Sequence, residues 1–247
     1  LHGYFIYSSC AFFSDLTLNW FREKRDKEKP FLMMYLHKAP HRPWWPSPEK
    51  FAEFYEKEFP EPETLFDDYK GRGSAAKSAE MNILTHMQYM HDSKIRPSTL
   101  EEMGEVNPEI VYYGIDGTEY RPGPGGFLVP FNRGNPDQIA KYNVTLDKIN
   151  NDFKENWPKM NDKEKMQWKF QRYMQDYLAT ISSIDDNVGR VLDYLEENDL
   201  EDNTLVVYTS DQGFYLGEHG WYDKRFIYDE SFKTPLLIKW PNKIKPG

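Results

Sequence analysis

Two short apolar runs, each followed at once by polar residues, constrain the fold of this chain more than any other feature. Residues 31–36 read FLMMYL and residues 204–209 read TLVVYT. Continuous runs of this kind are typical of strands that are buried on both faces of a parallel sheet. A third apolar run, at residues 235–240, predicts one more strand.

Helical periodicity occurs between the predicted strands. Apolar residues recur at helical spacing over residues 12–22, and they repeat at intervals of three and four over residues 165–200. We therefore predict a surface helix in the first segment and a long amphipathic helix in the second. The alternation of strand and helix predicts the α/β class, as a sandwich of sheet and helices.

The middle of the chain has no regular pattern. Residues 51–162 contain no repeat and mix acidic patches with glycine-rich stretches such as 114–126, within which residues 122–126 (PGPGG) must form a turn or loop. We predict a loop-rich insertion with short helices, including one over residues 74–90. The whole chain of 247 residues is interpreted as one domain, since that length can bury one sizeable core.

Charge and cysteine content exclude several classes of function. The formal net charge is -9, whereas a protein that binds nucleic acid needs a basic face to displace counterions from phosphate. No apolar run reaches the roughly 18 residues of a membrane span. The single cysteine, Cys10, excludes an internal disulfide and any zinc site built from several cysteines.

The polar residues that follow the two runs carry the candidate chemistry. In open α/β sheets ligands bind outside the carboxyl ends of strands, so we expect both polar clusters to converge on one crevice. Asp211 and Gln212 offer a carboxylate and an amide oxygen side by side, the hard donors that calcium or magnesium accepts. Lys224 supplies positive charge suited to a sulfate or phosphate oxygen. Taken alone, a simple turn and a solvated lysine are the commoner explanations.

His41 is the candidate residue after the first run. It lies between Pro40 and Pro43, whose rings restrict the backbone of this loop. A histidine in a stiff loop at a strand end is suited to general acid catalysis, because its ordinary pKa lies near neutrality. A single loop histidine is, however, more often structural or merely exposed.

Together these segments resemble the sulfatase family of the alkaline-phosphatase superfamily. Residues 37–44 (HKAPHRPW) are similar to the HxxPHxPW-type loop of that family, and residues 209–224 are similar to its TSDQGxxLGEHGWxxK segment. Residues 228–236 match the usual continuation. The resemblance implies an alkaline-phosphatase-like sandwich, with a mostly parallel sheet and helices on both faces. Residues 1–247 would be an incomplete, central portion of the catalytic domain.

The resemblance also implies roles for individual residues. Asp211 and Gln212 would be two ligands of one calcium ion, and Lys224 would bind a sulfate oxygen. His41 would donate a proton or a hydrogen bond to the oxygen of the leaving group. Lys224 and His41 are therefore the expected catalytic residues.

A substrate class follows from the same resemblance. His219 and Arg42 would contact the sulfate or the sugar. The segment resembles bacterial enzymes that act on sulfated glycans, including N-acetylglucosamine-6-sulfatases, and this implies a sulfuric ester hydrolase with a sulfated carbohydrate substrate. A periplasmic or secreted location is the matching expectation.

One part of the family pattern does not occur in the 247 residues. The family nucleophile is a formylglycine made from the cysteine, or sometimes serine, that opens a CxPSR motif. Cys10 is followed by Ala-Phe-Phe-Ser and lacks the proline and arginine. We expect the nucleophile and the remaining calcium ligands in an N-terminal part of the same protein, and little or no turnover from this piece alone.

Two other functions remain open at this point. A phosphodiesterase or phosphomutase of the same superfamily would use a serine or threonine nucleophile with two metals. A non-catalytic fragment that binds a glycan or a protein partner would need no nucleophile. The tryptophans are equally ambiguous, since Trp44, Trp45 and Trp221 suit stacking on a sugar ring and core packing alike.

Overall fold

The structure is a computed structural model that describes residues 9–108, 112–113, 119–120 and 134–247. The turn or loop predicted at residues 122–126 lies outside these residues. The helices are α1 (Ser9–Asn19), α2 (Pro48–Tyr55), α3 (Ser74–Ser78), α4 (Pro97–Met103), α6 (Pro136–Asn156), α7 (Asp162–Glu197) and α8 (Asp229–Phe232). The strands are β1 (Tyr112–Tyr113), β2 (Glu119–Tyr120), β3 (Val206–Thr209), β4 (Tyr215–Leu216), β5 (Tyr222–Asp223) and β6 (Leu236–Lys239).

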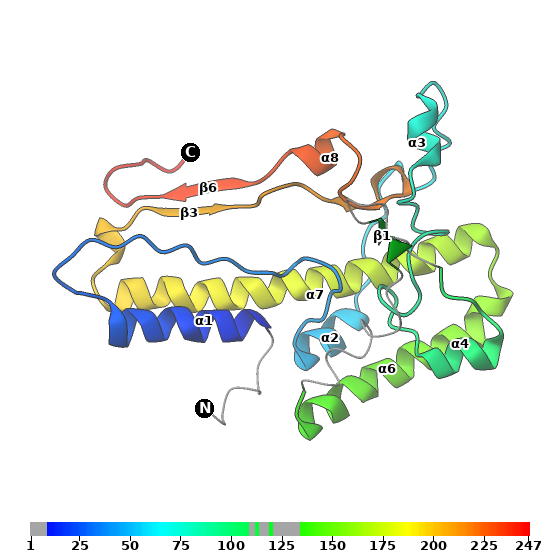
Figure 1. Cartoon of the computed structure of the whole chain (residues 1–247), viewed down its shortest axis with the longest axis horizontal. Helices are drawn as coiled ribbons and strands as arrows, with labels where there is room; N and C mark the ends of the chain where they lie inside the picture. The colour runs from blue at the N-terminus through cyan, green and yellow to red at the C-terminus, as the bar shows by residue number, and fades with distance from the viewer. Residues whose placement is uncertain (1–8, 109–111, 114–118, 121–133) are drawn as a thin grey trace.

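Helix α7 runs along most of the length of the molecule (Figure 1). Its N-cap, Asn161, accepts hydrogen bonds from the amides of Lys163 and Glu164, and the Glu164 carboxylate accepts one from the Asn161 amide. The predicted long amphipathic helix is thus confirmed. No helix among the described residues is apolar over a stretch long enough to cross a membrane.

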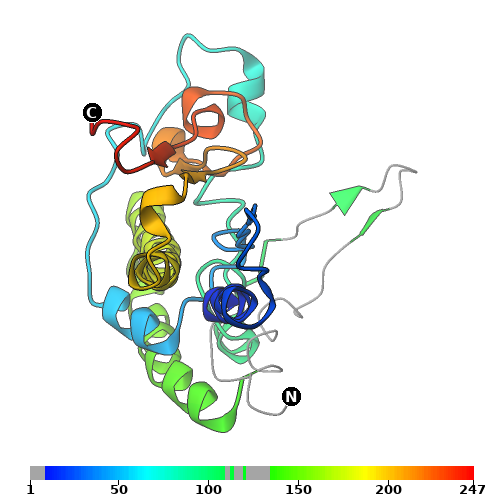
Figure 2. The ribbon, with the colours of Figure 1, turned by 90° about the vertical axis from the view of Figure 1, so that its left-hand side faces the viewer.

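Helix α1 confirms the predicted surface helix, which a π-helical turn (Trp20–Lys24) extends. Figure 2, which looks along α7, shows α1 on one side of α7 and the β3–β6 pair above it. Leu18 and Phe21 pack against Val191, Tyr194 and Leu195 of α7. This contact fixes the two helices side by side.

The α/β class is confirmed, with small sheets beside long helices. Strand β3 pairs with β6 in antiparallel register, with Val206 opposite Lys239. The pairs β1–β2 and β4–β5 are antiparallel too. The parallel neighbours expected for a large central sheet are therefore not formed among the described residues.

The prediction of a doubly buried strand at residues 31–36 is wrong for the described structure. The segment runs alongside α1 and α7 (Figure 1) but has no strand neighbour among the described residues. Phe31, Met33 and Tyr35 pack on the α1–α7 cluster, whereas Leu32 is 87% exposed and Met34 is 71% exposed. A strand needs a neighbouring strand to bond with, and this segment lacks one among the described residues. In an extended chain alternate side chains point to opposite sides, so only every second side chain of the segment packs on the helices.

The prediction of a helix over residues 74–90 is wrong beyond Ser78. The amide of Ile83 donates to the carbonyl of Gly220, and the amide of Tyr222 donates to the carbonyl of Met81. In a helix the amide of Ile83 would donate to the carbonyl of the residue four positions earlier, and the carbonyl of Met81 would accept from the amide four positions later. The long-range bonds take the place of those bonds. The segment instead joins the distant residues 220–222 through an antiparallel bridge.

The region predicted as a loop-rich insertion also contains a long helix, α6, of 21 residues. Asn135 begins it with a capping box to Gln138, and Leu146, Ile149 and Phe153 are fully buried on its inner face. This core includes Phe51 of α2 and Leu100 of α4. The sequence did hold a signal for α6, since Tyr142, Leu146, Ile149 and Phe153 recur at helical spacing, and the prediction of a loop-rich insertion overlooked it.

A lysine is buried in the core where α7 approaches residues 84–89. Lys169 has 0% of its surface exposed, and its Nζ donates to the carbonyls of Leu84 and Met87, each at 2.8 Å. The ammonium also lies 4.4 Å from the centre of the Tyr89 ring. Burial lowers the pKa of Lys169 to about 7, although Asp92 and Glu105 oppose the shift.

Replacing Lys169 by methionine is expected to change how stability depends on pH. Since the pKa of Lys169 is about 7 in the folded protein and about 10.4 in an unfolded chain, the unfolded state binds more protons between these values. The free energy of unfolding should therefore rise with pH in this window, by about 2 kcal/mol between roughly pH 8 and pH 9.5. Urea unfolding at both pH values measures the slope.

The Lys169→Met variant should lose this rise, while Lys163→Met, an exposed position on the same helix, should keep it. An unchanged slope in Lys169→Met would assign the pH dependence to other groups.

Candidate active site

The predicted metal ligands lie in the loop that leaves β3. Asp211 is exposed and Gln212 is half-buried. The next residue, Gly213, donates its amide to the carbonyl of Ser231, and the amide of Phe214 donates to the carbonyl of Glu230 at 2.7 Å. A Cβ at position 213 would lie 2.2 Å from the Glu230 oxygen. Only glycine fits there, so this loop is held tightly against residues 230–231.

Lys224 lies at the other end of the same segment, after β5. It is half-buried and forms no ion pair with any residue that the structure describes. Its neighbours Asp223 and Arg225 pair with each other instead, so Arg225 is already occupied by a carboxylate. The ammonium of Lys224 therefore keeps its charge available for an anionic ligand.

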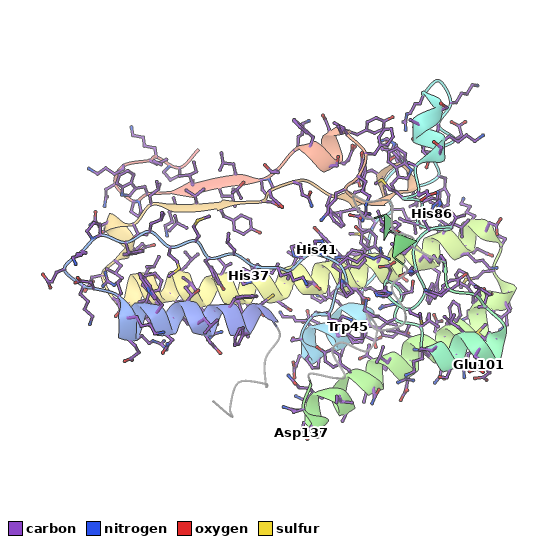
Figure 3. All side chains as sticks on the ribbon, viewed as in Figure 1. His37, His41, Trp45, His86, Glu101 and Asp137 are labelled. Carbon is purple, nitrogen blue, oxygen red and sulfur yellow. The ribbon has the colours of Figure 1, made fainter. Side chains whose placement is uncertain are left out.

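His41 is exposed at the end of the extended segment that passes along α7, and Figure 3 shows it beyond His37 on that segment. Its Nδ1 lies 2.7 Å from the carbonyl oxygen of Arg42 and donates to it. Its amide donates to the carbonyl of Lys38, and the indole of Trp44 donates to the carbonyl of Pro40. Because Nδ1 is hydrogen-bonded, Nε2 is the ring nitrogen left for chemistry.

Contacts between aromatic and charged side chains join the two clusters. Trp44 packs edge-on against Phe214, with 6.2 Å between ring centres. The guanidinium of Arg42 lies 5.4 Å from the centre of the Tyr222 ring. The loop that carries His41 thus touches the segment 211–224 near both of its ends. The two loops therefore lie against each other, whereas a crevice shared by His41 and Lys224 stays a prediction.

Burial decides the role of two tryptophans. Trp44 and Trp221 are both 0% exposed. Trp44 packs on Tyr173 of α7, and Trp221 stacks on Tyr69. Both are core residues, because a ring without exposed surface has no face for a sugar.

Arg42 makes a bidentate ion pair that sequence reasoning missed. Its Nε and Nη2 donate to Oδ1 and Oδ2 of Asp92, each at 2.5 Å. The Asp92 side chain is 0% exposed, and that of Arg42 is 12% exposed. No spacing rule links residues 42 and 92, so the sequence held no signal for this pair.

His219 is held by a second group of carboxylates. Its Nδ1 lies 2.7 Å from Oδ2 of Asp67, its Nε2 lies 3.7 Å from Oε1 of Glu230, and Arg72 also pairs with Asp67. Burial alone would raise the pKa of Asp67, but hydrogen bonds from His219, the Tyr69 amide and Arg72 hold it below the ordinary value.

A cavity of about 500 Å³ opens beside His219. It is lined by aromatic, aliphatic, basic and acidic side chains, namely Arg72, His219, Ile227, Tyr228, Asp229, Glu230 and Phe232. Sequence reasoning predicted His219 as a site residue but missed Asp67 and Arg72, which reach it from a distant segment.

The metal donors fit calcium in kind but not in number. Calcium takes roughly six to eight oxygen ligands. Asp211 and Gln212 supply two, and the described residues contain no group of three or more His, Cys, Asp or Glu side chains that could hold a metal ion. The two donors would therefore make up only part of such a site.

Comparison with known proteins points to one family. The family model described as Sulfatase matches residues 4–247. The N-acetylglucosamine-6-O-sulfatase of Bacteroides thetaiotaomicron is 43% identical over 234 residues, which cover 95% of this chain and 38% of that protein. Iduronate 2-sulfatase of Homo sapiens is 39% identical over 75 residues, which cover 30% of this chain and 14% of that protein.

A solved structure matches over nearly the same range. The structure of BT4656 in complex with its substrate D-glucosamine-2-N,6-O-disulfate aligns with a TM-score of 0.79 and 38% identity. The alignment covers 96% of this chain and 44% of that chain. The chain therefore spans less than half the length of these two relatives.

Proposed function

The chain belongs to the sulfatase family, and from this premise we propose that it supplies part of the active site of a sulfuric ester hydrolase acting on a sulfated sugar or glycan. The observation that carries the proposal is the meeting of the two clusters, through the Trp44–Phe214 and Arg42–Tyr222 contacts. These contacts support the proposal because they bring the loop that carries His41 against the segment that carries Asp211, Gln212 and Lys224.

In this proposal each site residue has one role. Lys224 binds a sulfate oxygen through its ammonium, which no described carboxylate neutralises. His41 presents Nε2 to the leaving-group oxygen and donates its proton there. Asp211 and Gln212 hold one side of a calcium ion, which when bound withdraws charge from the sulfate.

We propose that the rest of the site comes from polypeptide outside these 247 residues. Two oxygen donors are too few for calcium. No cysteine or serine in the chain opens a CxPSR motif, so a formylglycine nucleophile would also have to come from such a segment.

Arg42 and His219 are the proposed contacts to the substrate. Asp92 holds Arg42 in place, and Asp67 holds His219 in place. The binding of substrate therefore does not have to immobilise these two side chains, which lowers its entropy cost. The cavity beside His219 adds aromatic and polar groups of the kinds that bind sugars.

For the substrate we propose a 6-O-sulfated glucosamine unit. The support is that the relative from Bacteroides thetaiotaomicron is named for N-acetylglucosamine-6-O-sulfate, and the solved relative carries a glucosamine disulfate. A periplasmic or secreted location fits an enzyme that degrades glycans.

A second candidate function is glycan or partner binding without catalysis. The absence of a CxPSR motif from the 247 residues favours it. The two functions differ in one measurement, the release of sulfate from N-acetylglucosamine-6-sulfate by the full-length protein. Release would support the hydrolase, and binding without release would support the alternative.

Substitution of Lys224 tests the sulfate contact. The Lys224→Ala variant is expected to lose about a hundredfold in kcat/KM, the usual effect of removing one group that stabilises transition-state charge. The exposed Lys233→Ala, whose ammonium already pairs with Asp229, is the matched control and should retain activity. Equal activity of the two variants would exclude Lys224 from the sulfate site.

A further inference from the structure

Asp92 occupies an unusual place for a carboxylate. Its side chain is fully buried, and both oxygens accept from Arg42, at 2.5 Å each. Oδ2 also accepts from the Gln88 amide at 2.7 Å, within the turn that carries Asp92. Three donors therefore fix the carboxylate plane, and the planar guanidinium must lie in the same plane.

The clamped guanidinium is connected to His41 through the chain. Arg42 directly follows His41, and its carbonyl oxygen accepts the hydrogen bond from Nδ1 of the imidazole. Holding the Arg42 side chain limits rotation of that residue, and so limits movement of the carbonyl that orients the ring. The direction of Nε2 thus depends on the ion pair with Asp92.

The same guanidinium also fixes the distance to the sulfate-binding segment. It lies over the ring of Tyr222, two residues before Lys224. Tyr222 is itself anchored, since its amide donates to Met81 and its hydroxyl donates to the carbonyl of His86 at 3.1 Å. Asp92, Arg42 and Tyr222 form a continuous connection between the histidine loop and the lysine segment.

Stability does not explain such a pair well. Buried ion pairs are often no more stabilising than apolar side chains of the same size, because both charges lose their hydration. The pair does fix one geometry, since a bidentate contact has a defined orientation as well as energy.

We propose that Asp92 is a positioning residue that sets the orientation of His41 through Arg42. The inference rests on the proposed function, in which His41 protonates the leaving group. Asp92 does not touch substrate. Its loss would free the Arg42 side chain and let the histidine loop move. The segment that carries Lys224 and the metal donors would stay in place, because Tyr222 also bonds to Met81 and His86 and Gly213 bonds to Ser231.

The test compares two substrates whose leaving groups differ in their need for a proton. The leaving group of a sugar sulfate is an alkoxide, which departs slowly unless it is protonated. The leaving group of 4-nitrophenyl sulfate is a stable phenolate, which needs no proton. In the full-length protein, Asp92→Asn should lower kcat about a hundredfold on N-acetylglucosamine-6-sulfate and less than about fivefold on the aryl sulfate, the difference expected when general acid catalysis is impaired. An equal loss on both substrates would overturn the proposal.

Asp176→Asn is the matched control. Asp176 is equally buried and pairs with Arg172 at 2.6 Å within α7. Its Oδ2 lies 3.4 Å from Nζ of Lys94, which closely follows the turn that carries Asp92, so this variant removes a buried carboxylate beside that turn and keeps the pair of Arg42 with Asp92. It should lower thermal stability as Asp92→Asn does, without separating the two substrates. The same separation in Asp176→Asn would mean that general loosening of the fold causes the effect.

A second readout does not need turnover. With ¹³C-labelled histidine, the Cε1 signal of His41, assigned by His41→Gln, should shift or broaden in Asp92→Asn and remain unchanged in Asp176→Asn. An unchanged signal in Asp92→Asn overturns the positioning role. Absence of sulfate release by the wild-type protein would count against the proposed function alone.

Discussion

Replacing Asp211 by alanine is expected to lower kcat/KM for a sulfate ester by at least about a thousandfold in the full-length protein, since a metal ion supplies several kcal/mol of charge stabilisation. Of the two proposed calcium ligands, Asp211 is a carboxylate and Gln212 is a neutral amide. Without Asp211, the described chain offers one oxygen donor. Steady-state kinetics during calcium titration measure the effect.

The metal dependence provides the control for this prediction. Chelation should reduce the wild-type enzyme to the level of Asp211→Ala, and added calcium should restore the wild type only. Asp202→Ala, at an exposed position in the turn before β3, should behave as wild type. Calcium-independent activity of Asp211→Ala at the wild-type level would remove Asp211 from the metal site.

Replacing Trp44 by alanine is expected to lower the free energy of unfolding by about 3–5 kcal/mol, the range for deleting a large aromatic side chain from a core. Trp44 is 0% exposed and lies 4.8 Å from the ring centre of Tyr173, while its indole nitrogen donates to Pro40. The deletion would leave a cavity between the histidine loop, α7 and Phe214. Urea unfolding at a fixed pH measures the loss.

A double-mutant cycle separates this contact from general destabilisation. Trp44→Phe keeps an aromatic ring and should cost less than the alanine variant. The effects of Trp44→Ala and Phe214→Ala should be non-additive by about 0.5–1.5 kcal/mol, the coupling of an aromatic pair in contact. Strict additivity would mean that the two clusters do not meet in solution.

The sequence alone was sufficient for elements whose signal is local. The three- and four-residue repeat of α7 and the apolar spacing of α1 are properties of single helices, so both helices were predicted correctly. The motifs at residues 37–44 and 209–224 identified the family for the same reason, because each is a short, continuous stretch. The motif at residues 209–224 does follow a strand, β3, whereas the motif at 37–44 follows an extended segment that is not a strand among the described residues.

Elements that depend on distant partners were not predictable in this way. An apolar run such as 31–36 indicates extended chain, but whether it becomes a strand depends on a neighbour that pairs with it. The segment after Ser78 has helix-forming residues, yet its backbone bonds to Gly220 and Tyr222 instead. Local propensity is a fraction of a kcal/mol per residue and is easily outweighed by such contacts.

The residues of the candidate site also differ in whether a local signal or a distant contact identifies them. The sequence by itself determined the chemical groups, His41, Asp211, Gln212 and Lys224, because each lies inside a continuous motif. Only the tertiary structure decided which side chains hold the proposed substrate contacts Arg42 and His219. Asp92 reaches Arg42 across fifty residues, and Asp67 reaches His219 across 152. Such a carboxylate has to be close to its partner in space, but it needs no fixed distance from it along the sequence. Its position is therefore known only once the chain is folded.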